Sequence, residues 1–396
     1  MSPALPLIVH LDADAFFVAC EQALRPELRG TKCAVGGTQR GIISSASYEA
    51  RACGVYTPMP TVSARKICPD LIMIPHTGGL YGTVSRQMFD RCESLTPVVQ
   101  RNSIDEGYLD LGPCGLRDLQ AVEMAVRGLQ EKIWADLKIT VSMGIAANKL
   151  VAQIASKLSK PRGFVVVPVG EEEEFLAPLG IGKLPGIGAK AEAGLDAQGF
   201  RLVGDILTRN EGDLARAFGD GWREVVAMAR GQDTRPVEMT DEDAKSYSQQ
   251  ETFHEDLGDF AAVARIAKRM VDELLALVRA DGKRVKTITV KVRYGDFTQM
   301  AHGRSLATAS DLEVRFYPLV ETLLREAWTQ RRKLRLVSVR FSGVEHGAEQ
   351  LEMFNQSDEK RRKLAAVLDR MNAGEKKPRV LHGHQLGGQK SHPEPA

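Results

Sequence analysis

Three carboxylates stand at the ends of short apolar segments of this sequence. Asp12 follows the run LIVHL (residues 7–11), which has the apolar, partly β-branched composition of a buried strand, and Asp105 and Glu106 follow Ile104. Carboxylates at the rim of a core need protons, hydrogen bonds or a cation. With no cysteine or metal-spaced histidine nearby, the set suits Mg²⁺ or Mn²⁺. Two such ions can bridge the attacking and leaving oxygens of a phosphoryl transfer.

The chain must bring these distant acids together for such chemistry. We expect a hairpin strand after Ile104 to present Asp105 on the same rim as Asp12, with Glu106 placed by a local distortion. His10, inside the first strand, is expected to be a hydrogen-bonded core residue rather than a ligand. Taken one at a time, the acids have the alternative interpretation of ordinary surface carboxylates.

The first 165 residues have the pattern of a mixed α/β domain. The segment NKLVAQIASKLSKP (148–161) places apolar residues on one face at helical spacing, and its proline bars continuation of the helix. Apolar strands are expected at 7–11, 138–145 and 164–169. Residues 170–235 then include LPGIGAK (184–190), a glycine-punctuated turn ahead of a helix, and the polar stretch 237–250 is expected to be an exposed linker.

A second α/β unit follows this linker. The strand KTITVKVRY alternates apolar residues with threonine, lysine and arginine, which predicts one apolar face and one basic face. The expected helices cover 261–280 and the region around 317–330, and the expected strands cover 286–294 and 336–344. The tail from about 371, rich in Gly, Lys, His and Pro, is expected to be disordered.

Composition sets wider limits on the protein. The 396 residues are too many for one core and predict two to four domains, and no apolar run reaches the roughly 18 residues of a membrane span. Six scattered cysteines without a secretion signal favour reduced thiols and a cytoplasmic location. Residues 244–345 carry 18 basic against 13 acidic side chains, whereas residues 1–243 have a net charge of −5. This asymmetry is a mild indication of a polyanion partner, with ordinary surface variation as the alternative.

Four motifs in this order and spacing closely resemble those of the Y-family translesion DNA polymerases, in particular the bacterial DNA polymerase IV branch. They are DADAFFVACEQ (12–22), SASYEARACGV (45–55), SIDEGYLDL (103–111) and SKLSKPRGF (156–164). The resemblance extends to about residue 355. It implies a template-directed, low-fidelity DNA polymerase for damage tolerance, without proofreading, that adds deoxynucleotides to a primer 3′-hydroxyl by two-metal phosphoryl transfer.

The implied fold is a multidomain α/β (α+β) right-hand polymerase. Its palm would comprise 1–20 and 75–165, its small fingers 21–74, and a helical thumb with a helix-hairpin-helix 166–236. A linker at 237–244 would lead to a little finger at 245–345, built as a four-stranded sheet backed by two helices. Residues 346–396 would form a tail that contains a clamp-binding peptide at 350–354.

The resemblance also assigns roles to individual residues. Asp12, Asp105 and Glu106 match the metal ligands, and the backbone carbonyl of Ala13 would complete one of two Mg²⁺ sites, with Mn²⁺ as an alternative ion. The triphosphate contacts would come from Tyr48, Arg51 and Lys160, whose donors suit a polyphosphate. Their neighbours Lys149, Lys157 and Arg162 are expected to be solvated or to face DNA. Gly107 stands where relatives carry alanine and is expected to loosen the turn after the ligands.

Phe17 matches the steric gate, an aromatic ring under the sugar of the incoming nucleotide that would collide with a 2′-hydroxyl. Phe16 is counted with the nucleotide-binding positions, but we expect its ring to face the core, since adjacent side chains in an extended chain diverge. Ile42 and Ser44 match the positions above the nascent base pair. Their modest size would leave room for damaged templates.

Primer-template DNA, a deoxynucleoside triphosphate and the bacterial sliding clamp are the implied partners of a monomer. Gly186, Gly188 and Lys190 of the hairpin would grip duplex backbone through N–H donors near a helix start. Basic residues of the little finger would lie along phosphates on one sheet face: Lys286, Lys291, Arg293, Arg304 and Arg340. RRKLR (331–335) either joins them or is a solvated turn. The clamp peptide would use Gln350, Leu351, Met353 and Phe354.

Two other function classes fit parts of this pattern. A nucleotidyl cyclase also uses a small palm with two metal-binding carboxylates, but it needs neither a DNA-gripping hairpin nor a clamp peptide. A catalytically inactive relative that only binds DNA would not need Asp12, Asp105 and Glu106 intact.

Overall fold

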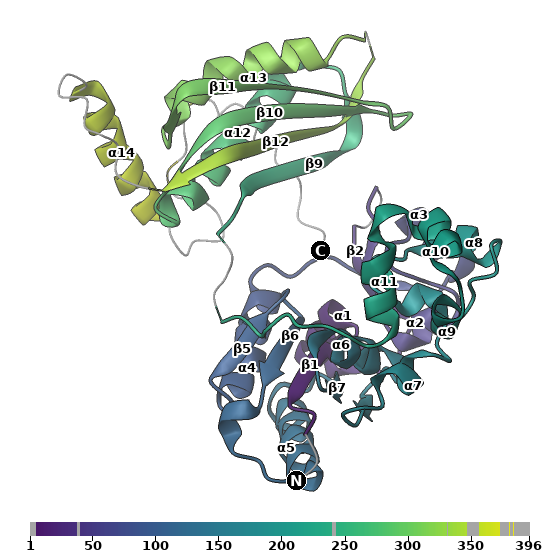
Figure 1. Cartoon of the computed structure of the whole chain (residues 1–396). Coiled ribbons are helices and arrows are strands. Elements are labelled where there is room, and N and C mark those ends of the chain that lie inside the picture. The colour runs from purple at the N-terminus through teal and green to yellow at the C-terminus, as the bar shows by residue number, and fades with distance from the viewer. Residues whose placement is uncertain are drawn as a thin grey trace. The chain divides into compact units, whose positions relative to one another are not determined.

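The computed structural model describes residues 5–37, 40–239, 243–330, 332–346, 356–372, 380 and 383. The chain divides into two compact units, one made of residues 1–38 and 42–241 and the other of 39–41 and 242–396 (Figure 1). None of the helices in the described ranges combines the length and the apolar character needed to traverse a bilayer.

A five-stranded sheet forms the centre of the first unit. Its strands are β1 (Ile8–Ala13), β5 (Val98–Arg101), β6 (Glu106–Asp110), β7 (Val141–Ala146) and β8 (Phe164–Val166), in the order β5-β6-β1-β7-β8. The predicted strands at 7–11, 138–145 and 164–169 correspond to β1, β7 and β8. The central strand β1 is buried on both faces, which is why it has so few polar residues.

Helices cover both faces of this sheet. One face packs on α1 (Phe16–Leu24), α4 (Leu80–Glu93) and α5 (Leu119–Leu137), through a core that includes Val9 and Leu11. Residues 10 and 12 of β1 therefore face the opposite side, where α6 (Lys149–Leu158) packs. Asn148 caps α6 by accepting from the Val151 N–H at 3.1 Å, and the helix lies within the segment 148–161 that was expected to be helical.

Two smaller modules complete the first unit. A three-stranded sheet in the order β3-β2-β4 was not anticipated. Its strands are β2 (Cys33–Gly36), β3 (Ile43–Ala46) and β4 (Ile72–Ile74). The same stretch of the chain contains the 3-10 turn η1 (Pro26–Leu28) and the short helices α2 (Tyr48–Ala52) and α3 (Thr61–Ile67). The other module is helical: α7 (Glu172–Leu176), η3 (Ile181–Lys183), α8 (Ala189–Asp196), α9 (Val203–Leu207), α10 (Glu211–Phe218), η4 (Gly219–Gly221) and α11 (Trp222–Ala229). Its apolar side chains share a core with α6.

The second unit is a four-stranded antiparallel sheet with two helices on one face (Figure 1). Its strands are β9 (Ser246–Leu257), β10 (Lys283–Tyr294), β11 (Gln299–Ser310) and β12 (Leu334–His346), in the order β11-β10-β12-β9, and its helices are α12 (Phe260–Ala280) and α13 (Glu313–Ala327). Residues 246–250, expected to belong to a linker, are part of β9, because Tyr247 and Phe253 pack into the core.

An additional helix, α14 (Gln356–Asn372), lies in the tail, where no element was expected. Arg279 of α12 holds it by donating to both carboxylate oxygens of Asp369, at 2.6 and 2.9 Å. Arg279 also donates to Glu313 at 2.7 Å. The expected disorder from about 371 falls largely outside the described residues.

Candidate active site

The end of β1 delivers Asp12 to the side of the sheet that faces α6. Asp12 pairs in register with Glu106 on β6 and with Ser142 on β7, so the two carboxylates lie opposite each other on adjacent strands. The prediction that Asp105 is the regular strand residue and that Glu106 is placed by a local distortion is therefore wrong, because the two roles are exchanged. Glu106 is the regular strand residue and Asp105 lies in the preceding bend, because the Ser103 hydroxyl accepts from both of their N–H groups at 3.1 Å.

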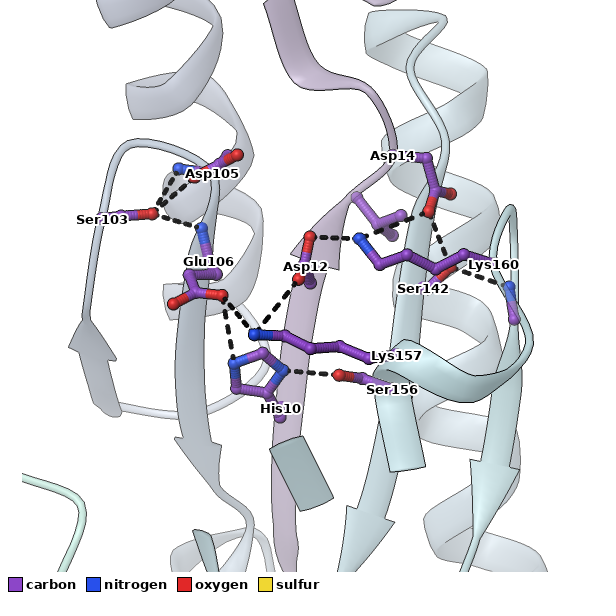
Figure 2. Close-up of polar contacts among 12 residues, drawn as sticks. His10, Asp12, Asp14, Ser103, Asp105, Glu106, Ser142, Ser156, Lys157 and Lys160 are labelled. Carbon is purple, nitrogen blue, oxygen red and sulfur yellow. Dashed lines mark hydrogen bonds and ion pairs between the residues drawn. The ribbon is translucent and has the colours of Figure 1, made fainter. Parts of the chain in front are cut away.

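Asp105 is nevertheless held beside the end of β1. Its carbonyl accepts from the Ala13 N–H at 2.9 Å. Its carboxylate accepts from the Ser103 hydroxyl at 2.5 Å (Figure 2). The three carboxylates thus gather at one rim but do not converge, and within the described ranges no three His, Cys, Asp or Glu side chains are arranged around a common metal position.

Two lysines from α6 and the loop after it lie among these acids (Figure 2). The Lys157 ammonium lies 3.3 Å from Glu106 Oε2 and 4.0 Å from Asp12 Oδ2, and Lys160 forms an ion pair with Asp12 and lies 3.7 Å from Asp14 Oδ1. The Lys157 side chain is exposed, as expected of a solvated charge, but its ammonium also pairs with two carboxylates, which was not expected. The Lys157 ammonium thus lies between the carboxylates of Asp12 and Glu106, where a divalent metal ion would also be bound. Two adjacent carboxylates of this kind fit Mg²⁺ or Mn²⁺.

Burial raises the pKa of Asp12, and the neighbouring Glu106 acts in the same direction, whereas Lys160 and Lys157 oppose the rise. The buried carboxylate therefore depends on nearby positive charge to remain ionised. A site that needs cations to neutralise clustered acids is typical of metal-dependent phosphoryl transfer.

His10 lies beneath the two acids and has no accessible surface. Its Nδ1 is 2.7 Å from the Ser156 hydroxyl, in line with a hydrogen-bonded core residue, but Nε2 has no hydrogen-bond partner and lies 3.9 Å from Glu106 Oε2. Burial, followed by the charges of Lys157 and Lys160, lowers the pKa of His10 to about 3. The ring is therefore neutral and adds no charge below the acids.

Asp14 is a site residue that the sequence analysis did not assign. It is buried and accepts from the Ser142 hydroxyl and from the Arg162 N–H, both at 2.8 Å, while Ser142 accepts from the Gly163 N–H at 2.9 Å. These bonds fix the loop that carries Lys160. The Asp-x-Asp spacing at a strand end was the available signal.

Of two other charges near this site, only Lys149 differs from the expectation, since Arg162 is exposed. Lys149 is buried rather than solvated, since its ammonium donates to Gln100 at 2.8 Å and to the Pro236 carbonyl at 3.1 Å. Arg162 donates to both carboxylate oxygens of Glu131 at 2.7 Å. Gly107 lies inside β6 rather than in a turn, and a Cβ there would be 2.6 Å from the Gln100 carbonyl.

The expected triphosphate contacts Tyr48 and Arg51 lie on α2. The Arg51 guanidinium lies 4.9 Å from the centre of the Tyr48 ring, and its Nε donates to the Ala46 carbonyl at 3.0 Å. Burial and the neighbouring charge of Asp14 raise the pKa of Tyr48, so its hydroxyl stays protonated and can donate to a phosphate. The exposed Ile42 and half-buried Ser44 lie close by in sequence, at the start of β3.

The two phenylalanines occupy the first turn of α1, not an extended segment. Phe16 is buried in the core, as expected, although the reason differs: adjacent helical side chains point about 100° apart, which directs Phe17 toward the half-exposed side. The change from strand to helix takes place at Ala15, which has a left-handed backbone with φ 46°.

The turn at LPGIGAK has a left-handed backbone position that is occupied by glycine. Gly186 has φ 89°, a conformation that favours glycine, and Gly188 precedes the first turn of α8, where Lys190 is exposed. The preceding segment is the 3-10 turn η3 rather than a full α-helix.

The basic residues of the second unit do not all share one face. Lys291 and Arg293 alternate with buried Val290 and Val292 on β10, and Arg340 of β12 pairs in register with Thr289, so these three side chains lie on the sheet face away from the helices. The expectation is wrong for Arg304. It pairs with buried Ile288 and forms an ion pair with Glu326 of α13, on the helix-covered face.

Lys286 lies at a register shift between Val285 and Thr287, where the ladder of β10 is irregular. In RRKLR, Arg332 pairs with Asp296 at 2.8 Å, and Arg331 is outside the described residues. The clamp peptide, with Gln350, Leu351, Met353 and Phe354, also lies outside the described residues.

Comparison with known proteins gives consistent results. Residues 11–157 match the impB/mucB/samB family, and residues 244–353 match the C-terminal domain of that family. The chain is 68% identical over 383 residues to a DNA polymerase IV of Opitutus terrae, a match that covers 96% of this chain and 98% of the relative. It is 34% identical to a DNA polymerase IV of Desulfatibacillum aliphaticivorans, over 95% of this chain and 96% of the relative.

Solved structures agree with these relatives. A Y-family DNA polymerase chimera of Dbh and Dpo4 matches with a TM-score of 0.78 and 26% identity, over 86% of this chain and all of that chain. An insertion ternary complex of Dbh DNA polymerase matches with a TM-score of 0.62 and 26% identity, over the same shares.

Proposed function

The chain belongs to the Y-family DNA polymerases, in the impB/mucB/samB family that includes DNA polymerase IV, and from this premise we propose which of its residues perform the reaction. The enzyme is a DNA-directed translesion DNA polymerase. We assign the palm to residues 1–20 and 75–165, the fingers to 21–74, the thumb to 166–236, the linker to 237–244 and the little finger to 245–345.

Asp12, Asp105 and Glu106, with the Ala13 carbonyl, would hold two Mg²⁺ ions, or Mn²⁺ in their place. The observation that carries this assignment is that one cation, the Lys157 ammonium, lies between the two carboxylates, 4.0 Å from Asp12 and 3.3 Å from Glu106. When bound, the two metals would stabilise the attacking and leaving oxygens of the transfer. Asp105 must turn its carboxylate from Ser103 toward Asp12 to join them.

The surrounding side chains position the nucleotide. Lys160, released from Asp12, donates to the triphosphate, and Asp14 keeps its loop in place. Tyr48 and Arg51 add a hydroxyl and a guanidinium to the same phosphates. Phe17 closes the space beside the sugar C2′ and so selects deoxyribonucleotides, while Ile42 and Ser44 leave space above the base pair.

Single-nucleotide primer extension tests the ligand assignment. Asp12→Asn should reduce kcat by about 10³-fold or more, since it removes a charge that the transition state requires. Asp110→Asn is the matched control, because Asp110 lies at the opposite end of β6, where it accepts from the Gly112 N–H. Retained activity in Asp12→Asn would refute the assignment. An active wild type also excludes the cyclase and inactive-relative alternatives, neither of which extends a primer.

The remaining assignments concern macromolecular partners. Lys291, Arg293 and Arg340 lie along DNA phosphates from the open face of the sheet, and the turn at Gly186 and Gly188, followed by Lys190, grips the duplex backbone. We include Lys286 among the phosphate-contacting side chains from its place in the sequence pattern. Residues 350–354 dock on the bacterial sliding clamp through Gln350, Leu351, Met353 and Phe354. The protein acts in the cytoplasm as a monomer.

A further inference from the structure

The ring of Phe17 lies beside three other aromatic rings of the first unit, those of Phe16, His76 and Tyr81. Its centroid lies 4.6 Å from that of Tyr81 on α4 and 6.0 Å from that of His76, and the last two rings are 6.2 Å apart. Tyr81 is buried, whereas His76 is exposed. The position of the Phe17 ring therefore depends on where Tyr81 is held.

The hydroxyl of Tyr81 is fixed by two hydrogen bonds. It donates to Glu21 Oε1 at 2.7 Å and accepts from the Thr77 N–H at 3.1 Å. Glu21 has no accessible surface, and its second oxygen accepts from the Arg25 guanidinium at 2.6 Å. The carboxylate thus links α1, α4 and the loop at Thr77.

Glu21 and Phe17 are four residues apart on α1, so they lie on the same face of this helix. Burial acts to raise the pKa of Glu21, but hydrogen bonds from Thr77, Tyr81 and Arg25 outweigh it and lower the pKa. The group is therefore an ionised, buried carboxylate in the core beside the sugar-selecting ring.

Burying a carboxylate costs free energy, and an apolar side chain would fill the same space without that cost. A steric filter needs a wall that does not yield, because a shift of about 1 Å is enough to admit or exclude a hydroxyl oxygen. A short, charge-assisted hydrogen bond is directional, so it fixes Tyr81 more narrowly than packing would.

We propose that Glu21 is a positioning residue for sugar selection, which acts by holding Tyr81 as the support behind Phe17. The inference rests on the proposed role of Phe17 as the steric gate. Glu21 does not touch the nucleotide, and its effect is confined to how firmly the Phe17 ring resists a 2′-hydroxyl.

The test is the ratio of kcat/KM for a deoxynucleotide to that for the matching ribonucleotide, on one primer-template. Tyr81→Phe removes the hydroxyl and keeps the ring, and Glu21→Met removes the acceptor at similar volume. Each substitution should lower the ratio by roughly fivefold, because the loss of the charge-assisted hydrogen bond lets Tyr81, and with it the Phe17 ring, move. The rise in kcat/KM for the ribonucleotide should exceed any change in kcat/KM for the deoxynucleotide. Glu21→Gln keeps an acceptor oxygen for the Tyr81 hydroxyl but loses the charge, so it should lower the ratio less than Glu21→Met does.

Gln22→Ala is the control. Gln22 follows Glu21 on α1 but donates to the Leu28 carbonyl at 3.1 Å, away from Tyr81, so its loss should leave the ratio unchanged. The inference is overturned if Tyr81→Phe keeps the wild-type ratio, or if both nucleotides lose kcat/KM equally, as a purely structural role predicts. Tyr81→Phe decides the matter should Glu21→Met fail to fold.

Phe17→Ala separates this inference from the proposed function. A lower ratio in Phe17→Ala with unchanged ratios in Tyr81→Phe and Glu21→Met would refute the role of Glu21 and leave the gate in place. An unchanged ratio in Phe17→Ala would refute the gate, and the role of Glu21 with it.

Discussion

The Lys157 ammonium competes with divalent cations for the carboxylates of Asp12 and Glu106. A bound metal must displace it, so Lys157→Ala should increase the affinity of the site for Mg²⁺ and Mn²⁺. The same substitution at Lys160 would be less informative, because Lys160 is also proposed to bind the triphosphate.

The size of the effect follows from the distances. Lys157 Nζ lies 3.3 Å from Glu106 and 4.0 Å from Asp12, which in water corresponds to about 1.3 and about 1.0 kcal/mol of attraction. The lysine side chain is 45% exposed. Salt and the entropy of a long exposed side chain reduce the sum to about 1 kcal/mol, or roughly fivefold in metal affinity.

The assay is binding of Mn²⁺, followed through the EPR signal of the free ion, to protein with primer-template and a non-hydrolysable nucleotide. The Mg²⁺ concentration for half-maximal incorporation provides a second measure. Lys157→Arg keeps the charge and should retain the wild-type affinity. Lys132→Ala, on the exposed side of α5, makes the same change in net charge without touching the site.

An unchanged or weaker metal affinity in Lys157→Ala would refute this reasoning. It would mean that Lys157 does not occupy the metal-binding carboxylates. Equal gains in Lys157→Ala and Lys132→Ala would attribute the effect to net charge rather than to the ion pair.

Three further outcomes are expected. Arg340→Ala should weaken binding to all DNA sequences and reduce the slope of log binding constant against log salt concentration by about 1. Arg304→Ala, on the helix-covered face, should change DNA affinity and this slope little, and equal effects of the two substitutions would contradict the separation of the two faces. Phe341→Ala, in the core of the second unit, should cost about 3–5 kcal/mol of stability in denaturant unfolding followed by Trp328 fluorescence, and a loss below about 1 kcal/mol would contradict its place in the core. Deletion of 350–354 should abolish clamp-stimulated synthesis but not basal extension, and unchanged stimulation would exclude this peptide.

Local patterns were sufficient to predict many of the elements. The apolar run that becomes β1, the helical stripe of α6, and the alternation of Lys291 and Arg293 with valines on β10 are each set within a few residues. The acids Asp12, Asp105 and Glu106 could likewise be identified as candidate ligands from their types and their neighbouring strands.

Short strands and a late helix were missed for a physical reason. β2, β3 and β4 are only three or four residues long, so their pattern is too brief to detect and their stability comes from pairing with one another. α14 is strongly charged and is held by the contact of Asp369 with Arg279, which no local pattern reveals.

The sequence by itself determined the chemical groups of this protein and most of the elements that carry them. Only the tertiary structure decided which groups meet. The register of β1 with β6 places Glu106, not Asp105, opposite Asp12, and the packing of α6 directs Lys157 between them. Strand register and helix packing are set by contacts between residues far apart in the chain, so the partners of a charged side chain cannot be derived from its neighbours in sequence.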